Sequence, residues 1–252
     1  MQLTRITNTI FLLLAIQGGL RAQNSNTIFL SQGKIEFEKK VNNYADLKDD
    51  NTWDELTKKT VSKFKLSYFD LLFTRNKSLF KPGREVADDK GPGWMTQPAE
   101  DNIVYSELDN EKCVSQKKVF EQLFLVQDSL RTIRWKLTDE TRTIAGFSCR
   151  RANAIIMDSI YVVAFYTDEI LTTGGPESFN GLPGMILGVA LPHQHVSWFA
   201  TKVQAISVSD AEVVAPHKGK KVNNAALKET LVELAKNWGG DFGKRYTIMT
   251  ML

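Results

Sequence analysis

The chain has 252 residues, of which 42% are hydrophobic and 24% charged, and its formal net charge is +3. This composition is typical of a globular protein with a sizeable core, and it excludes fibrous and low-complexity chains. A charge so close to zero excludes the clustered lysine and arginine surface of a nucleic-acid-binding protein. We expect the one dense basic run, Lys218–Lys221, to be a solvated loop.

The first 22 residues have the pattern of a secretory signal peptide. Arg5 supplies a basic start, Ile10–Ile16 is a short apolar run, and a cut after Ala22 is expected. The apolar run is much shorter than the roughly 20 residues that cross a bilayer, which favours an export signal over a membrane anchor. Residues 23–252 are then one exported domain without a transmembrane segment, located in the periplasm, at the outer membrane or outside the cell.

Alternating polar and apolar residues predict strands through most of the exported domain. In the first strand, Ile35, Phe37 and Val41 share one face, while Glu36, Glu38 and Lys40 share the other. A capping box formed by Thr52 and Glu55 predicts a short helix after it. Further strands are expected at residues 64–73, 78–80, 117–127, 130–138, 144–156 and 160–167. Short polar turns between the last four predict an antiparallel meander.

Two other segments complete the predicted fold. Residues 81–101, rich in proline, glycine and acidic side chains, are expected to form a long surface loop. Residues 224–238 predict a helix, with Asn224 as its cap and a leucine stripe that must be buried. The predicted class is therefore α+β: a curved, open antiparallel sheet with this C-terminal helix packed on one face.

The two cysteines, Cys113 and Cys149, would lie in an oxidising compartment, where a disulfide can persist. In the predicted meander one strand separates the strand after Cys113 from the strand that holds Cys149. That separation exceeds the reach of a disulfide unless the chain around Cys113 folds back. A disulfide and two separate thiols are both left open.

The stretch Gly181-Leu182-Pro183-Gly184 carries no reactive group and predicts a rigid structural corner. Pro183 suits the second position of a type II turn, and Gly184 supplies the positive φ of the third position. The corner then starts a strand at residues 185–191 that is apolar on both faces. On one of these faces Ile186, Gly188 and Ala190 leave room for close approach by the C-terminal helix or by a bound apolar ligand.

Several segments together resemble the GLPGLI family of exported bacterial proteins. Gly181–Leu187 matches the family signature except for one methionine, and Trp135–Ala152 is similar to its strand–turn–strand block. Val163–Ile170 leads into the signature as in the family, with Phe165 where tryptophan is common. The resemblance covers roughly residues 34–207 and implies an exported β-rich protein, without implying a reaction.

A pair of histidines is the best candidate for metal binding. On an extended chain His193 and His195 would face the same way and could share one ion. Zinc needs three or four ligands, and the only other histidine is His217, so carboxylates would have to complete the site. The alternative is that both histidines belong to an exposed turn.

The loop from Thr167 to Gly184 carries three carboxylates, Asp168, Glu169 and Glu177, which could perform acid–base chemistry. Asp168 and Glu169 are adjacent, however, so on a strand they would point in opposite directions. A loop that seals the sheet is the alternative. The sequence has none of the motifs of common hydrolases or nucleotide-binding enzymes.

The sequence therefore predicts an exported cell-envelope protein that binds or carries an apolar ligand or a segment of a partner envelope protein. No catalytic residue and no nucleic-acid partner are predicted. The alternatives are a metal-binding or metal-delivery protein that uses the histidine pair, with the metal ion as its only cofactor, and a hydrolase that uses the loop carboxylates.

Overall fold

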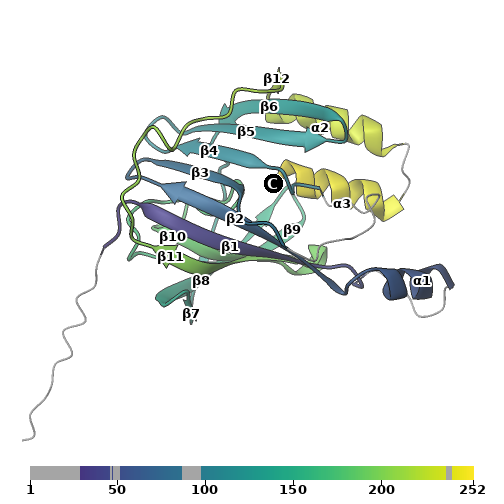
Figure 1. Ribbon diagram of the computed structural model, residues 1–252, viewed down its shortest axis with the longest axis horizontal. Coiled ribbons are helices and arrows are strands. Elements are labelled where there is room, and N and C mark those ends of the chain that lie inside the picture. Colours follow the sequence, from purple (N-terminus) through teal and green to yellow (C-terminus); the bar gives the residue numbers. More distant parts are fainter. Residues whose placement is uncertain (1–28, 46, 48–51, 87–97, 237–239) are drawn as a thin grey trace, which may run out of the picture.

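The computed structural model describes residues 29–45, 47, 52–86, 98–236 and 240–252. In this part of the chain, twelve strands form one strongly curved sheet, accompanied by three α-helices (Figure 1). The strands are β1 (Gly33–Asn42), β2 (Phe64–Phe73), β3 (Lys77–Pro82), β4 (Ile103–Glu107), β5 (Lys112–Val119), β6 (Gln122–Ser129), β7 (Lys136–Ile144), β8 (Phe147–Ile156), β9 (Ile160–Thr167), β10 (Met185–Leu191), β11 (Val196–Gln204) and β12 (Lys220–Val222). The helices are α1 (Thr52–Thr60), α2 (Asn224–Ala235) and α3 (Gly240–Met251), with one 3-10 turn, η2 (Pro192–Gln194).

Two meanders make up the sheet. Strands β1 to β6 follow one another in space, and so do β7 to β11. The first strand of one meander, β1, pairs with the last strand of the other, β11, and this long-range pairing joins the two halves. Every pairing between two of these strands is antiparallel except that of β12 with β6, which is parallel.

The predicted α+β class is therefore wrong. The described chain is mostly β, and its sheet is mixed because β12 adds a parallel strand at one edge. The sequence predicted a single meander, whereas the β1–β11 pairing connects two of them. Pairing between strands so far apart in sequence leaves no local pattern, because it is chosen by the packing of the whole sheet.

One predicted strand, residues 117–127, is a hairpin. The chain turns at Phe120, which has a positive φ of 50°, and β6 runs back along β5. Residues 130–135 form no strand, and β7 pairs with β8 rather than with β6. A non-glycine residue at positive φ gives no clear sequence signal, and the turn was therefore missed.

The main core fills the inner, concave face of the sheet. Alternate residues of β1, among them Ile35 and Phe37, point into it together with Trp198 of β11. Helix α3 closes the interior, with Met249 and Leu252 buried in the same cluster (Figure 1). The concave face is thus occupied by side chains and by a helix.

The end of the chain differs from the prediction in two ways. Helix α2 is capped by Asn223 rather than Asn224, because the Asn223 side chain accepts a hydrogen bond from the backbone N–H of Ala226 at 2.9 Å. A further helix, α3, follows it and was not predicted. Helix α2 buries Leu227 and Leu231 beside β5 and β6, and α3 enters the interior. The predicted helix terminus, Trp238 and Gly239, lies outside the described residues, as does the middle of the predicted 81–101 loop.

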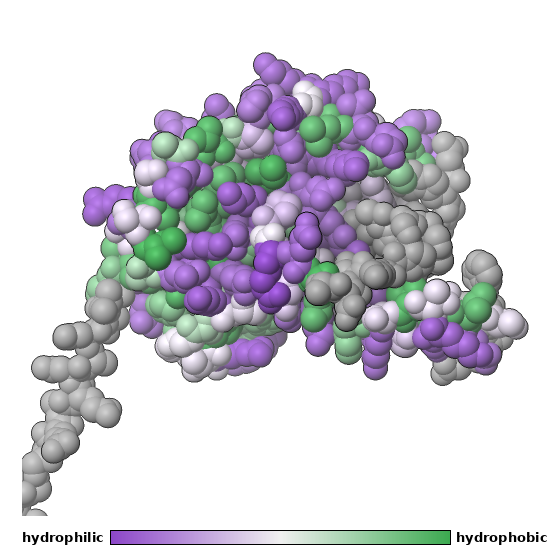
Figure 2. Space-filling view, in the orientation of Figure 1, coloured by the Kyte–Doolittle hydropathy of each residue, from purple (hydrophilic) through white to green (hydrophobic). Residues whose placement is uncertain are grey.

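The outer face carries a smaller apolar cluster over the first meander. Leu72, Leu79 and Val114 belong to it, and the segment after β11 covers them with Val208 and Val213. On the face seen in Figure 2 hydrophobic residues lie in small groups between hydrophilic ones. None of the described helices has both the length and the apolar character needed to cross a membrane.

Candidate functional site

Four side chains that carry a charged or amide group lie fully buried inside the curved sheet. They are Lys39, Asn102, Lys117 and Glu177, and none of them is more than 3% exposed. Lysine and glutamate are almost never fully buried unless they are paired. We call this group the interior polar cluster, and it is the most unusual chemistry in the described part of the chain.

Strand parity places the two lysines. Lys39 alternates with Phe37 and Val41 on the inner face of β1, and Lys117 alternates with Ser115 on β5. Because the strands lie on opposite sides of the first meander, their lysines approach the interior from two directions. Glu177 is the acidic residue of the cluster, and it lies on the loop that joins β9 to β10.

The Glu177 carboxyl group holds the centre of the cluster. Its Oε2 atom accepts a hydrogen bond of 2.9 Å from the Asn102 side-chain amide. Its Oε1 atom is buried without a hydrogen-bond partner. Burial raises the pKa of Glu177, and the charges of Lys39 and Lys117 only partly oppose that rise. The residue also has a positive φ of 51°, a strained conformation that the surrounding loop must hold.

The amine of Lys39 contacts the chain just before β4. Its Nζ atom donates to the carbonyl oxygens of Pro98 and Ala99, each at 3.2 Å. It also lies 5.9 Å from the centre of the Phe69 ring and 5.7 Å from that of Trp198. Burial lowers the pKa of Lys39.

Lys117 and Arg131 meet the carboxyl end of helix α3. The Lys117 Nζ atom donates to the backbone oxygen of Thr250 at 2.8 Å, and the Arg131 guanidinium donates to that of Met251. The last carbonyl groups of a helix have no partner within the helix and carry partial negative charge, so cations stabilise them. The last turn of α3 contains no basic residue, and β5 and the segment after β6 supply both cations.

Burial also changes the pKa of the lysine at this helix end. It lowers the pKa of Lys117 to about 8, with Glu177 opposing the shift. A cavity of about 20 Å³, lined by Lys117, Arg131 and Ser178 among others, adjoins the contact. That space suits one water molecule rather than a substrate. The arrangement can therefore bind the end of a helix.

The loop that carries Glu177 is fixed at several points. Arg131 Nε donates to Ser178 Oγ at 3.1 Å, and Trp135 Nε1 donates to the backbone oxygen of Asn180 at 2.8 Å. The loop thereby connects the segment between β6 and β7 with the interior.

The three loop carboxylates expected in the hydrolase hypothesis do not converge. Asp168 is exposed, and Glu169 accepts a 3.4 Å hydrogen bond from the backbone N–H of Ser148. Glu177 points inward to Asn102 instead. The structure brings Glu177 together with lysines that the sequence reading did not select.

The histidine pair does not lie on an extended chain. His193 belongs to the 3-10 turn η2, and His195 ends it in the left-handed region with a φ of 53°. The argument that alternate residues face the same way fails in a 3-10 turn, because that argument holds only for a strand. Within the described residues no group of three or more His, Cys, Asp or Glu side chains is placed to hold a metal ion.

The space expected beside Gly188 is filled by side chains of the sheet. A Cβ atom added at Gly188 would lie 2.6 Å from the Phe199 ring and 3.1 Å from Ile144. Ile186 is fully buried and Ala190 partly so. The expected close approach at this glycine is made by side chains of β11 and β7.

The Gly181–Gly184 corner has a tighter turn than expected. The N–H of Gly184 donates to the carbonyl oxygen of Leu182 at 2.8 Å, so the hydrogen bond closes around Pro183 alone. Gly184 has a φ of +136°, and a Cβ atom there would lie 2.1 Å from the Thr167 oxygen. Pro183 is exposed, whereas Leu182 and Gly184 are buried.

Both cysteines are free thiols. Cys113 lies on β5 and Cys149 on β8, and seven strands separate β5 from β8 in the sheet order. The predicted spacing of one intervening strand is wrong because the two halves join through β1 and β11. Burial raises the pKa of Cys149 to about 12 and also raises that of Cys113.

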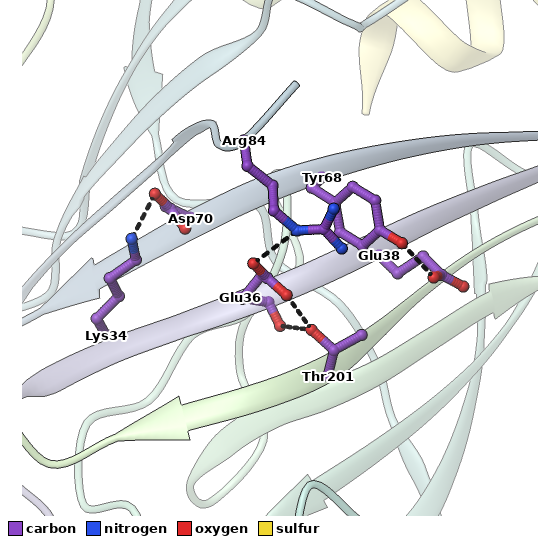
Figure 3. A network of polar contacts seen from close by, with 7 residues as sticks. All are labelled: Lys34, Glu36, Glu38, Tyr68, Asp70, Arg84 and Thr201. Carbon is purple, nitrogen blue, oxygen red and sulfur yellow. Dashed lines mark hydrogen bonds and ion pairs between the residues drawn. The ribbon is translucent and has the colours of Figure 1, made fainter. Parts of the chain in front are cut away.

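A second polar group lies on the outer face of β1, β2 and β11 (Figure 3). Lys34 pairs with Asp70 at 2.7 Å, and Tyr68 donates to Glu38 at 2.9 Å. Glu36 accepts hydrogen bonds from Arg84 at 3.1 Å and from Thr201 at 2.6 Å. We call these seven residues the outer network.

The two lysines were missed although one signal was available. Lys39 has the same strand parity as Phe37 and Val41, so the alternation itself places it inside. Lys117 belongs to the segment that was predicted as one long strand, and the missed turn at Phe120 hid its position. No local pattern points to Asn102, whose role depends on Glu177, 75 residues later.

The fold and the interior polar cluster define a mostly β protein with one curved sheet closed by a helix. Residues 155–188 match a family model described as "Protein of unknown function (Porph_ging)". This span includes Glu177 and the Gly181–Gly184 corner. No curated protein matches the chain.

Among solved structures, the chain is similar to PNGF-II in two crystal forms. For the C2 form the sequence identity is 15% and the TM-score 0.52, and the match covers 79% of this chain and 32% of PNGF-II. For the P21 form the values are 14%, 0.53, 79% and 33%. The chain thus spans about a third of the length of PNGF-II, and the likeness shows the fold alone.

Proposed function

We propose that this protein is an exported, non-enzymatic binding module whose concave face holds a helical segment of a partner protein. The observation that supports the proposal is the position of α3 against the concave face of the sheet. Met249 and Leu252 are buried in the main core, while Lys117 and Arg131 bind the carbonyl oxygens at the end of the helix. A site that combines apolar burial with cations for a helix end is specific for a helix that ends there.

Of the two occupants expected from the sequence, a partner segment is favoured over an apolar ligand. Side chains fill the space beside Gly188, and the cavity near Lys117 suits only a water molecule. A segment can enter by replacing α3, because it would use the same apolar contacts and the same two cations. Export and a place in the cell envelope remain part of the proposal and are supported by the signal-peptide pattern of residues 1–22.

Membership of the GLPGLI family is also proposed. It is supported by the Gly181–Leu187 signature, which lies within the residues matched by the family model of unknown function. The match takes in 79% of this chain but only 32% of PNGF-II, which agrees with a domain that can serve as a module.

The proposal can be tested by helix exchange. A protease site placed at residues 237–239, between α2 and α3, allows the covalent link to be cut after folding. We expect a fluorescent peptide of residues 240–252 to replace the native helix and to raise the fluorescence anisotropy. A peptide with Met249→Asp should bind at least tenfold more weakly, because it would bury a charge in the core.

A matched protein variant, Lys117→Met, distinguishes the contact at the helix end from non-specific hydrophobic binding. It keeps an apolar stem but removes the donor to Thr250, so we expect weaker exchange with the unmodified peptide. Equal binding of both peptides to both proteins would contradict the proposal. A cut protein that takes up no peptide, even under mildly denaturing conditions that loosen α3, would also contradict it.

A further inference from the structure

Three buried residues in the interior polar cluster have the chemistry needed to form an amide cross-link. Lys39 provides an amine, Asn102 a carboxamide and Glu177 a carboxyl group, and each is at most 2% exposed. The three come from distant parts of the chain: β1, the residue before β4, and the loop before β10. A bond between the first two would tie β1 to the chain just before β4, with two strands between them in the sheet order.

The contacts of Glu177 match the two proton transfers that such a reaction requires. Its Oε2 atom already holds the Asn102 amide nitrogen at 2.9 Å, and this nitrogen is the leaving group. Its Oε1 atom is buried without a partner and is free to accept a proton. A buried acceptor left unpaired is costly, and such groups often have a chemical role.

The surroundings of Lys39 favour a neutral, nucleophilic amine. Its Nζ atom donates to the carbonyl oxygens of Pro98 and Ala99, and a neutral amine has two N–H donors for these two acceptors, which leaves its lone pair free. The rings of Phe69 and Trp198 exclude water. Burial lowers the pKa of Lys39, which supports the same conclusion.

We propose that Lys39 and Asn102 become joined by an amide bond that forms within the folded protein, with Glu177 as the proton carrier. The Nζ atom moves from the Ala99 oxygen to the Cγ atom of Asn102, three residues further along the chain. The Nζ–Cγ bond forms and the Cγ–Nδ2 bond breaks. Glu177 takes one proton from Nζ and delivers one proton to Nδ2, which leaves as ammonia. Glu177 is returned unchanged, and no oxidant or other reactant is needed.

Mass spectrometry of the purified, denatured protein tests this directly. We expect a mass lower by one ammonia molecule than the sequence requires. After tryptic digestion, the peptide that contains Lys39 should be recovered covalently joined to the peptide that contains Asn102. Recovery of both peptides unlinked from folded wild-type protein, after prolonged incubation, would overturn the proposal.

Variants identify the role of each residue. Lys39→Met and Asn102→Ala should keep their full mass, and Glu177→Gln should slow or abolish the loss of ammonia. Lys40→Met is the matched control, because it removes the neighbouring amine of β1, whose side chain is exposed, and should leave the cross-link intact. An ammonia loss that persists in Lys39→Met would show cyclisation of Asn102 on its own backbone and would overturn the proposal. If a variant fails to fold, the wild-type digest still decides.

Discussion

The two faces of β1 carry two polar groups of similar composition in opposite environments. On the outer network, Lys34 and Glu36 pair with Asp70 and Arg84 at the surface, where water and salt can replace each partner. On the inner face, Lys39 and Glu177 lie without access to water. Burial, more than residue type, determines whether the charged or the neutral form of each group is favoured.

The pKa directions show this difference. Hydrogen bonds and neighbouring cations lower the pKa of Glu36, with Thr201 the largest cause, and thereby favour its charged form. Burial raises the pKa of Glu177 and lowers those of Lys39 and Lys117, which favours their neutral forms. The outer network is a solvated surface, whereas the inner cluster stores unfavourable free energy that the fold must offset.

Removing a buried partner should have the largest effect. We expect Glu177→Ala to lower the free energy of unfolding by about 3 kcal/mol, because it leaves the buried Asn102 amide without its acceptor and opens a cavity among buried side chains. The matched variant on the outer face, Glu36→Ala, should cost less than about 1 kcal/mol. Urea unfolding followed by tryptophan fluorescence measures both, and similar losses for the two variants would contradict the comparison.

The buried Lys117 should make stability depend on pH. Its pKa is about 8 in the folded protein and close to the ordinary 10.5 when unfolded. The unfolded state therefore binds more protons between these values, and stability rises with pH across the window by up to about 3 kcal/mol. Other groups titrate there too, including Cys113, so the test is the difference between wild type and Lys117→Met. A difference that stays constant from pH 7 to about 10.5 would refute this prediction.

The corner that positions the Glu177 loop should be less tolerant than its exposed neighbour. Gly184→Ala combines a positive φ with a clash against the Thr167 oxygen, so a loss of at least about 2 kcal/mol is expected. Pro183→Ala, at an exposed position in the same turn, should cost less than about 1 kcal/mol. Thermal unfolding of the two variants provides the comparison, and equal midpoints would show that the corner does not constrain the loop.

The smallest effect is expected on the outer network. A double-mutant cycle of Lys34→Met and Asp70→Asn should give a coupling of about 0.2–1 kcal/mol that decreases with added salt. The coupling free energy from urea unfolding at low and high salt checks this. A large, salt-independent coupling would mean that the outer face is as shielded as the inner one.

Local patterns predicted the strands but not their long-range arrangement. The alternation of β1, the strand β10 and helix α1 follow from side-chain periodicity and capping, which act over a few residues. The β1–β11 pairing, the turn at Phe120 and helix α3 depend on contacts across the whole chain. For that reason the sheet was predicted as one meander and its closing helix was missed.

The candidate site was predictable to a still smaller extent. Glu177 was selected as a carboxylate of the loop, but its expected partners were its neighbours in sequence. Its actual surroundings are Lys39 of β1, Lys117 of β5 and Asn102, the residue before β4. Parity could have placed Lys39 inside, yet only the folded sheet brings these residues together.

The central claim is that α3 is a bound segment held at its end by Lys117 and Arg131. Hydrogen–deuterium exchange of the intact protein tests it most directly, by comparing the amides of α3 with those of β10 in wild type and in Lys117→Met. We predict that α3 exchanges faster than β10 in wild type and faster again in the variant, while β10 stays protected. Exchange of α3 at the same slow rate as β10, unchanged in the variant, would contradict the account.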